Sequence, residues 1–307
     1  MFYFCKMQAT GNDFVLVDYT SEKVEYSFKL LAEYLCNRHY GVGADGLIII
    51  DKSVVADLKM RIFNPDGSEA EMCGNGIRCF AKYVYEHEIL RKEKFQVETM
   101  SGIKEIELKV EGKKVLSVKV EIGKPIFELK KIPVIYEVEK NLEKDMNRDY
   151  GKDNTQKLKC REDSLKNSNE YVKKGINIGE RIFYPVSLGN PHVVCFVDNL
   201  EETDVRDIGN KVENYKYFPN KTNVEFVQVV REDNIKVKVW ERGVGETLSC
   251  GTGACAAVII SHIVKSTNCE MIVDLTGGIL NVSYDKDNKK VYLEGEVQEV
   301  FIGNMRI

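Results

Sequence analysis

Apolar and polar residues alternate along much of this chain, and a period of two residues predicts β-strands. Helical spacing is rarer. It occurs at 28–35 and at 77–84, and the run 254–260 is apolar on nearly every side, which is typical of a buried helix. Within the first 130 residues the predicted strands are 15–17, 47–50, 59–63, 95–98, 103–110 and 116–122. The pattern predicts sheets wrapped around central helices.

The sequence also repeats itself. KMRIFNPDGSEAEMCGNG (59–76) aligns without a gap to KVKVWERGVGETLSCGTG (236–253), so Cys73 falls opposite Cys250, a shift of 250 − 73 = 177. The pair GN at 11–12 returns at 189–190, a shift of 189 − 11 = 178. VETMSGI (97–103) returns as VDLTGGI (273–279), a shift of 273 − 97 = 176. Similar shifts in chain order predict one duplicated unit.

These repeats set the expected domain organisation. We expect an N-terminal unit over 1–130 that carries Cys73 and a C-terminal unit over 182–307 that carries Cys250. The last strand of the chain is free to pack on the N-terminal unit. Between the units, 131–181 is dense in Lys, Glu, Asp and Asn, and this composition predicts a solvated linker or insertion.

Composition narrows the class of protein. The 307 residues are 43% hydrophobic and 30% charged, with a net charge of −4, which gives no electrostatic reason to expect nucleic-acid binding. No apolar run is long enough to span a membrane, and the first residues lack the layout of a secretory signal, so we expect a cytoplasmic protein. Nine cysteines without regular spacing predict free thiols. Those expected to be small core residues are Cys5, Cys36, Cys160, Cys195 and Cys269.

The two repeated cysteines carry the candidate chemistry. Each precedes a predicted helix and is followed by glycines, which let the backbone approach a ligand closely. Unpaired amides at a helix start bind anions such as an α-carboxylate, and their field should lower a thiol pKa from about 8.5 toward roughly 4–7. A carboxylate held between two such helix starts would have a thiol on either face of its Cα. This arrangement suits a racemase or epimerase; the alternative is that both thiols are core residues.

Five segments together resemble the diaminopimelate epimerase family, over the whole chain except the charged insertion. They are QATGNDFVLVD, RHYGVGADG, RIFNPDGSEAEMCGNGIRCFA, SLGNPHVV and ERGVGETLSCGTGACAA. The resemblance implies an α/β (α+β) fold of two pseudo-twofold-related units, each a mostly antiparallel sheet around a central helix, with the active site in the cleft between them. It further implies a homodimer without cofactor or metal that interconverts LL- and meso-2,6-diaminopimelate, in lysine and peptidoglycan precursor biosynthesis.

The resemblance also implies residue roles. Cys73 and Cys250 are the two bases, with roles that exchange with reaction direction; by family convention Cys73 is the donor and Cys250 the acceptor. His192 and Glu241 match groups that tune the thiols. The implied substrate-binding residues are Asn12, Asn64, Gly74, Asn75, Asn190, Asn223, Glu241, Arg242, Gly251 and Thr252. Gly46 and Phe301 stand where some members have a substrate-contacting glutamine and a dimer-contact tyrosine.

Other interpretations have less support. The glycines of GVGADG (41–46) satisfy the dinucleotide-binding spacing, but a helix precedes them and a strand follows, which is the reverse of what that motif needs. Cys36 and His39 with Cys73 and Cys79 lack zinc-ligand spacing. Two rival functions remain: a same-fold isomerase acting on proline, histidine or a small unsaturated acid, and a phenazine-pathway relative without the cysteine pair.

Overall fold

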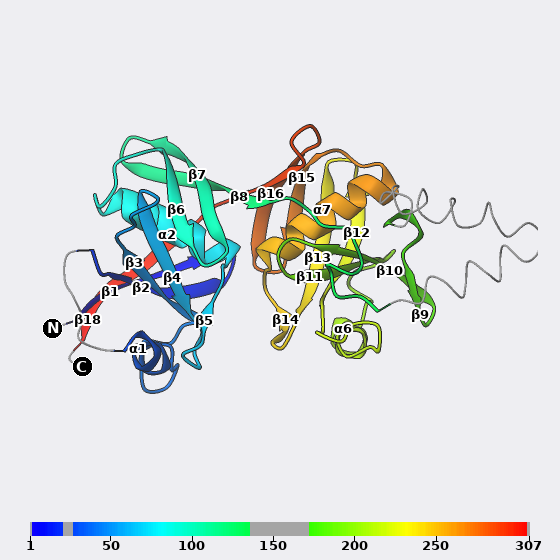
Figure 1. Cartoon of the computed structure of the whole chain (residues 1–307), viewed down its shortest axis with the longest axis horizontal. Helices are drawn as coiled ribbons and strands as arrows, with labels where there is room; N and C mark the ends of the chain where they lie inside the picture. Colours follow the sequence, from blue (N-terminus) through cyan, green and yellow to red (C-terminus); the bar gives the residue numbers. More distant parts are fainter. Residues whose placement is uncertain (1, 21–26, 136–171, 306–307) are drawn as a thin grey trace, which may run out of the picture.

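The computed structural model describes residues 2–20, 27–135 and 172–305, and these form two lobes side by side (Figure 1). The first lobe is built from β1 (Phe2–Ala9), β2 (Asn12–Asp18), α1 (Phe28–Leu35), β3 (Gly46–Asp51), β4 (Leu58–Phe63), β5 (Glu69–Ala70), α2 (Gly74–Glu86), β6 (Lys94–Thr99), β7 (Gly102–Glu111) and β8 (Lys114–Gly123). The second contains β9 (Ile176–Ile178), β10 (Arg181–Ser187), β11 (Pro191–Phe196), α6 (Val205–Glu213), β12 (Asn223–Arg231), β13 (Asn234–Glu241), β14 (Gly245–Thr247), α7 (Gly251–Lys265), β15 (Glu270–Leu275), β16 (Gly278–Asp285) and β17 (Lys290–Gly295). The chain ends with β18 (Gln298–Met305).

The strand pairing of the first lobe is repeated in the second. In the first, β1–β2, β3–β4, β4–β5, β6–β7 and β7–β8 are antiparallel, while β2–β3 and β4–β6 are parallel. In the second, β10–β11, β12–β13, β13–β14, β15–β16 and β16–β17 are antiparallel, while β11–β12 and β13–β15 are parallel. The predicted fold class, mixed α and β with two related units of mostly antiparallel strands, is confirmed.

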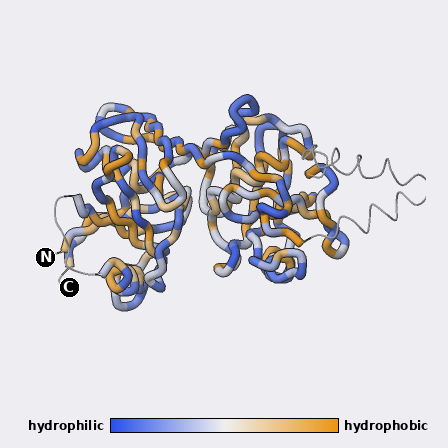
Figure 2. Tube along the Cα trace, viewed as in Figure 1, coloured by the Kyte–Doolittle hydropathy of each residue, from blue (hydrophilic) through white to orange (hydrophobic). Residues whose placement is uncertain are grey.

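Each lobe is organised around one helix. Strands such as β8 alternate buried and exposed side chains, so one face of each sheet is apolar. That face packs on α2 in the first lobe, where Ile77, Phe80 and Val84 are fully buried. In the second lobe α7 is buried on all sides from Ala254 to Ile260. Burying a large apolar side chain stabilises the fold by roughly 1.5–3 kcal/mol. Figure 2 colours the chain by hydropathy: hydrophobic residues gather inside each lobe, and many of the outer loops are hydrophilic.

Two strand pairings join the lobes. β8 pairs antiparallel with β17, with Val120 opposite Leu293, so the sheet continues from one lobe to the other. β18 then returns to the first lobe and pairs antiparallel with β1, with Phe2 opposite Met305 (Figure 1). The two lobes are therefore held together by main-chain hydrogen bonds as well as by side chains.

One predicted segment lies mostly outside the described residues, and one observed helix was not predicted. Most of the predicted linker (136–171, with Cys160) lies outside them. The sequence analysis missed α6, although two signals were available: Val205, Ile208 and Val212 keep helical spacing, and the N-cap Asp204 accepts from Asp207 N at 2.9 Å. Within the described residues, no helix is both long and apolar enough to cross a membrane.

Candidate active site

The two repeated cysteines occupy the same structural position. Cys73 is the N-cap of α2 and Cys250 is the N-cap of α7, and both have extended backbone angles. The Sγ of Cys73 accepts a hydrogen bond from Gly76 N at 3.4 Å, and the Sγ of Cys250 accepts one from Gly253 N at 3.4 Å. Each thiol therefore takes the place of the oxygen that usually caps a helix, and unpaired amides of the first turn lie beside it.

The two helix starts lie against each other. A Cβ added to Gly251 would sit 3.6 Å from Gly74 Cα, so the two backbones are in contact here, and it would also lie only 2.9 Å from Leu293 Cδ2, which favours glycine at this position. Asn75 Nδ2 donates across the junction to Ser249 O at 3.4 Å, and the hydroxyls of Thr10 and Ser249 lie 2.6 Å apart. Since each cysteine directly precedes one of these two glycines, the structure brings both thiols, one from each lobe, to a single junction.

An asparagine from the preceding strand pair faces each helix start. Asn12 Oδ1 accepts from Asn75 Nδ2 at 3.3 Å and lies 3.7 Å from Cys73 Sγ. Its counterpart Asn190 donates through Nδ2 to Thr252 Oγ1 at 3.3 Å, and that hydroxyl lies 3.5 Å from Cys250 Sγ. Four of the predicted binding residues therefore line the junction as two equivalent pairs.

A buried arginine supports the Cys73 side and was missed by sequence reasoning. Arg78 has 0% exposure and donates to Asn75 Oδ1 at 2.6 Å and to Gly74 O at 3.2 Å. Burial lowers the pKa of Arg78 to about 10, so it keeps its charge at neutral pH. The signal in the sequence was a charged residue in the middle of an apolar helix face, between Ile77 and Cys79. The Arg78 guanidinium fixes the first turn of α2 and orients the Asn75 amide.

Acidic groups surround the Cys250 side. Glu241, the last residue of β13, accepts a hydrogen bond from Thr247 Oγ1 at 2.6 Å. Burial raises the pKa of Glu241 above its ordinary value, although hydrogen bonds from Thr247 and Cys250 oppose the rise. Deeper still, His192 Nδ1 lies 2.6 Å from Glu225 Oε1, and both residues have 0% exposure.

The His192–Glu225 pair was only half predicted, since Glu225 was missed. His192 Nε2 lies 3.0 Å from Asn190 Oδ1, so both ring nitrogens face oxygen atoms. Within the described residues the second oxygen of Glu225 has no hydrogen-bond partner. Its signal in the sequence was a lone carboxylate in the apolar strand NVEFVQVV. The imidazole is therefore fixed between the Glu225 carboxylate and the Asn190 amide.

The expectation of depressed thiol pKa values is wrong for this structure. Burial raises the pKa of Cys73, and the amides of Gly76 and Asn75 only partly oppose it. Burial also raises the pKa of Cys250 well above its ordinary value, and the charges of Glu241 and Glu225 raise it further. Sequence reasoning counted the helix start but not the desolvation, which penalises the thiolate more than the amides stabilise it. Both thiols are protonated at neutral pH in this state.

The other predicted residues lie around this junction or apart from it. Asn223 Nδ2 donates to Pro191 O at 2.8 Å and its Oδ1 accepts from Arg242 N at 2.9 Å, so it joins the strand before the site to the turn after Glu241. The Arg242 guanidinium is exposed and donates to Asn220 O at 3.3 Å. Asn64 is exposed and its side chain donates to Ser68 Oγ at 3.0 Å within its own turn.

The described residues contain one set of His, Cys, Asp or Glu ligand atoms that are close enough to share a metal ion. This set is Cys5, His87 and Glu299, and it lies away from the two thiols.

Comparisons with known sequences agree over nearly the whole chain. The family model described as diaminopimelate epimerase matches residues 4–128 and 184–300. The diaminopimelate epimerase of Caldanaerobacter subterraneus subsp. tengcongensis is 45% identical over 304 residues, covering 99% of this chain and 99% of that protein. Those of Moorella thermoacetica (41%, covering 98% of each chain) and Methanococcus maripaludis strain C6 (38%, covering 99% of each) are similar over the same length.

Solved structures share the fold at low sequence identity. A phenazine biosynthesis protein of the PhzF family from Bacillus anthracis superposes with a TM-score of 0.65 at 17% identity, covering 100% of this chain and 99% of that one. A probable proline racemase from Agrobacterium radiobacter K84 gives 0.65 at 11% identity, covering 100% and 93%. At such identities the likeness establishes the two-unit fold alone. The full-length matches in sequence go further, and this chain belongs to the diaminopimelate epimerase family.

Proposed function

We propose that this chain is an epimerase that interconverts LL- and meso-2,6-diaminopimelate by proton transfer between two cysteines. The observation that carries the proposal is the contact between two helix starts, each capped by a thiol and contributed by a different lobe. Membership of the family and identities of about 40% over the whole chain supply the substrate. The reaction belongs to the formation of lysine and of peptidoglycan precursors.

The proposed binding mode uses the helix starts first. The α-carboxylate would accept hydrogen bonds from the first-turn amides at Gly74 and Asn75 and at Gly251 and Thr252, where both helix dipoles favour negative charge. Asn12 and Asn190 would hold the reacting amino-acid group from either side. Asn64, Asn223, Glu241 and Arg242 would hold the distal amino-acid group, with Arg242 forming two parallel hydrogen bonds to its carboxylate.

The proposed chemistry needs one thiolate and one thiol. The thiolate removes the α-proton, and the electron pair left on Cα spreads into the carboxylate, whose oxygens the helix amides stabilise by several kcal/mol. The opposite thiol then donates its proton to the other face of Cα and becomes the new thiolate. Since burial keeps both thiols protonated at rest, one must first lose its proton. Glu241, whose charge acts on both sulfurs, is the proposed acceptor.

Two further features complete the proposal. The reaction needs no cofactor, because the paired thiols supply both proton transfers, and a reducing compartment such as the cytoplasm keeps them unlinked. We also propose a homodimer through β18, where Val300, Phe301 and Ile302 are 55%, 46% and 59% exposed. Consecutive exposed apolar side chains of this kind are typical of an interaction surface.

A substrate comparison tests the function. With purified protein and a reductant in deuterated water, we expect LL-diaminopimelate to give the meso isomer with solvent deuterium at one α-carbon, as followed by proton NMR. Proline and histidine at the same concentration should give neither epimer nor label. The Cys73→Ala/Cys250→Ala variant is the control for contaminating activity. Faster turnover of proline or histidine than of diaminopimelate would contradict the proposed substrate.

A further inference from the structure

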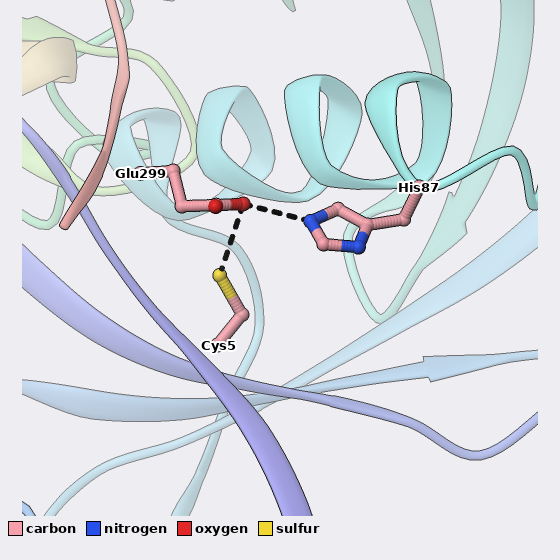
Figure 3. A group of neighbouring side chains, drawn as sticks. All are labelled: Cys5, His87 and Glu299. Atoms are coloured by element: carbon pink, nitrogen blue, oxygen red, sulfur yellow. Dashed lines mark hydrogen bonds and ion pairs between the residues drawn. The ribbon is translucent and has the colours of Figure 1, made fainter. Parts of the chain in front are cut away.

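A second chemical cluster lies away from the paired thiols, and the proposed reaction does not use it. Cys5 on β1, His87 directly after α2, and Glu299 on β18 point toward one another (Figure 3). Cys5 Sγ lies 3.5 Å from Glu299 Oε2, and His87 Nε2 lies 2.7 Å from the same oxygen. The three ligand atoms all lie within 4.8 Å of one another. Three elements far apart in the sequence thus converge on one point.

The strand register and one ring contact orient these side chains toward one another. The register of β1 and β18 shifts between Lys6 and Met7, so that Met7 pairs with Glu299 and Val300 is passed over. Opposite residues in antiparallel strands share a face, and a bulge turns the strand's side chains over. Glu299 therefore shares the α2-facing side with Met7 and Cys5. His87 is held by stacking on Tyr83, with ring centroids 4.2 Å apart.

We propose that Cys5, His87 and Glu299 form a binding site for a thiophilic divalent cation, with Zn²⁺ the best match. A thiolate, an imidazole and a carboxylate are the three protein ligands that Zn²⁺ takes, and harder cations such as Mg²⁺ do not select sulfur. Bond lengths of about 2.0–2.3 Å in a tetrahedron place neighbouring ligand atoms roughly 3.3–3.8 Å apart. The sulfur–oxygen distance of 3.5 Å already fits this geometry.

The remaining adjustment is small, and the site has access to solvent. The 2.7 Å contact between His87 and Glu299 must widen by under about 1 Å. The distance between the sulfur of Cys5 and the His87 nitrogen, which lies within 4.8 Å, must shorten by no more than about 1 to 1.5 Å. The side chains of His87 and Glu299 are 27% and 32% exposed, so Glu299 can turn and His87 can slide along the Tyr83 ring, whereas Cys5 is 1% exposed and fixed. A water molecule entering from the exposed side would fill the fourth position. When the ion binds, the Cys5 thiol releases its proton to water and its sulfur forms the metal bond.

Such an ion would fasten β18 to β1 and to the end of α2. The cation would bind only the folded arrangement, since these ligands are 82 and 212 residues apart along the chain (87 − 5 = 82; 299 − 87 = 212). Binding to the folded state alone raises the apparent stability. We therefore expect a structural role in the first lobe, independent of the proposed epimerisation.

Cobalt titration tests the site. The probe is Co²⁺, added to full-length Cys73→Ala/Cys250→Ala protein so that the paired thiols cannot bind it. We expect a thiolate-to-cobalt charge-transfer band in the near ultraviolet that saturates at one ion per chain. Cys5→Ser should abolish the band, and His87→Gln or Glu299→Gln should weaken cobalt binding by at least about 10-fold. In the same background, Zn²⁺ should raise the melting temperature only when Cys5 is present.

The matched control is Cys269→Ser. Cys269 Sγ lies 3.7 Å from His262 Nδ1, so it presents a thiol and an imidazole without belonging to the three-ligand set. This variant should keep the band and the zinc-dependent rise in melting temperature. Absence of a cobalt band, or a band that survives Cys5→Ser or disappears with Cys269→Ser, would overturn the proposal and leave His87–Glu299 as an ordinary ion pair. Glu299→Gln, at a partly exposed side chain, keeps the test valid should Cys5→Ser fold poorly.

Discussion

The two lobes have the same strand pairing but surround their thiols differently. In the second lobe the buried pair beside the helix start is His192 and Glu225. The corresponding positions in the first lobe hold Phe14 and Ile48 (192 − 178 = 14; 225 − 177 = 48). The match is visible in the contacts of the helices: a methyl group on Gly253 would lie 2.8 Å from Glu225 Oε1, and one on Gly76 would lie 3.2 Å from the Ile48 side chain.

This difference shows that the fold does not require polar residues at these positions. Phe14 and Ile48 show that the fold accepts an apolar pair at these positions. A buried pair of polar groups that hydrogen-bond to each other, such as His192 and Glu225, rarely stabilises a protein more than apolar residues of similar volume do. We infer that His192 and Glu225 are kept for the chemistry at Cys250. The duplication places two thiols symmetrically, and the unequal neighbours give them unequal proton affinities.

The largest expected effect comes from removing either thiol. If both sulfurs are obligatory, Cys73→Ala and Cys250→Ala should each lower kcat for epimerisation by about 10⁴-fold or more, because a positioned proton-transfer group contributes up to that much. Steady-state assays in both reaction directions measure this loss. Comparable losses would confirm that the thiols are equivalent in function despite their different neighbours. Near-normal turnover by either variant would contradict the two-base mechanism.

Glu241→Gln should have the next largest effect. The Glu241 charge acts on both sulfurs, and we expect kcat to fall roughly 10³-fold if this carboxylate accepts the first proton. Its charge raises the pKa of both thiols, so its removal should lower those pKa values and speed their alkylation by iodoacetamide at a fixed pH near 8. Glu246→Gln, an exposed neighbour, is the control and should change neither quantity. Slower alkylation of the Glu241→Gln variant would contradict the electrostatic assignment.

A double variant can give the second lobe the residues that the first lobe has at the corresponding positions. His192→Phe/Glu225→Ile should lower kcat by at least about 10²-fold, because it removes the polar pair beside Cys250. The free energy of unfolding should stay the same or rise by about 1–4 kcal/mol, because a buried polar pair is replaced by apolar side chains. Urea unfolding and the epimerase assay give the two quantities.

The single variant Glu225→Gln provides the contrast, since it keeps a buried histidine with a poorer partner and should destabilise the fold. Equal destabilisation of single and double variants would mean that the pair is structural.

The smallest expected effect concerns a charge network in the first lobe whose central carboxylate has no counterpart in the second. Asp13 Oδ2 lies 2.5 Å from Lys6 Nζ, and its carboxylate also pairs with Arg38; the equivalent position in the second lobe is Pro191 (191 − 178 = 13). Burial alone would raise the pKa of Asp13, but hydrogen bonds from Arg38 and Lys6 outweigh it and lower the pKa to about 2.

The pH dependence of this stabilisation follows from the linkage between folding and protonation. A depressed pKa stabilises the fold above the unfolded value of 3.8, and this stabilisation is lost as pH falls toward about 2. We expect Asp13→Asn to cost about 2 kcal/mol at pH 7 and much less at pH 2. Urea unfolding at both pH values measures the difference. The exposed Asp198→Asn is the control, and a pH-independent cost for Asp13→Asn would contradict the assignment.

Sequence reasoning found the duplicated fold because the repeats and the alternation of apolar residues are local signals. Cys73 and Cys250 followed from the repeat, and Asn12 and Asn190 from the family motifs. Glu225 and Arg78 were missed because each belongs to an apolar element, and only the three-dimensional contacts show that their partners are buried with them. The thiol pKa values were mispredicted for a related reason: desolvation depends on all the surrounding atoms, whereas a helix start can be recognised from neighbours in the sequence.

The return of β18 to the first lobe has a consequence for biosynthesis. A ribosome releases the N-terminal end of a chain first, and domains usually fold in that order. Here β18, the strand that pairs with β1, is translated after the whole of the second lobe. The first lobe must therefore wait, with the β1 edge of its sheet uncovered, until β18 has left the ribosome, and an uncovered strand edge in a nascent chain favours aggregation.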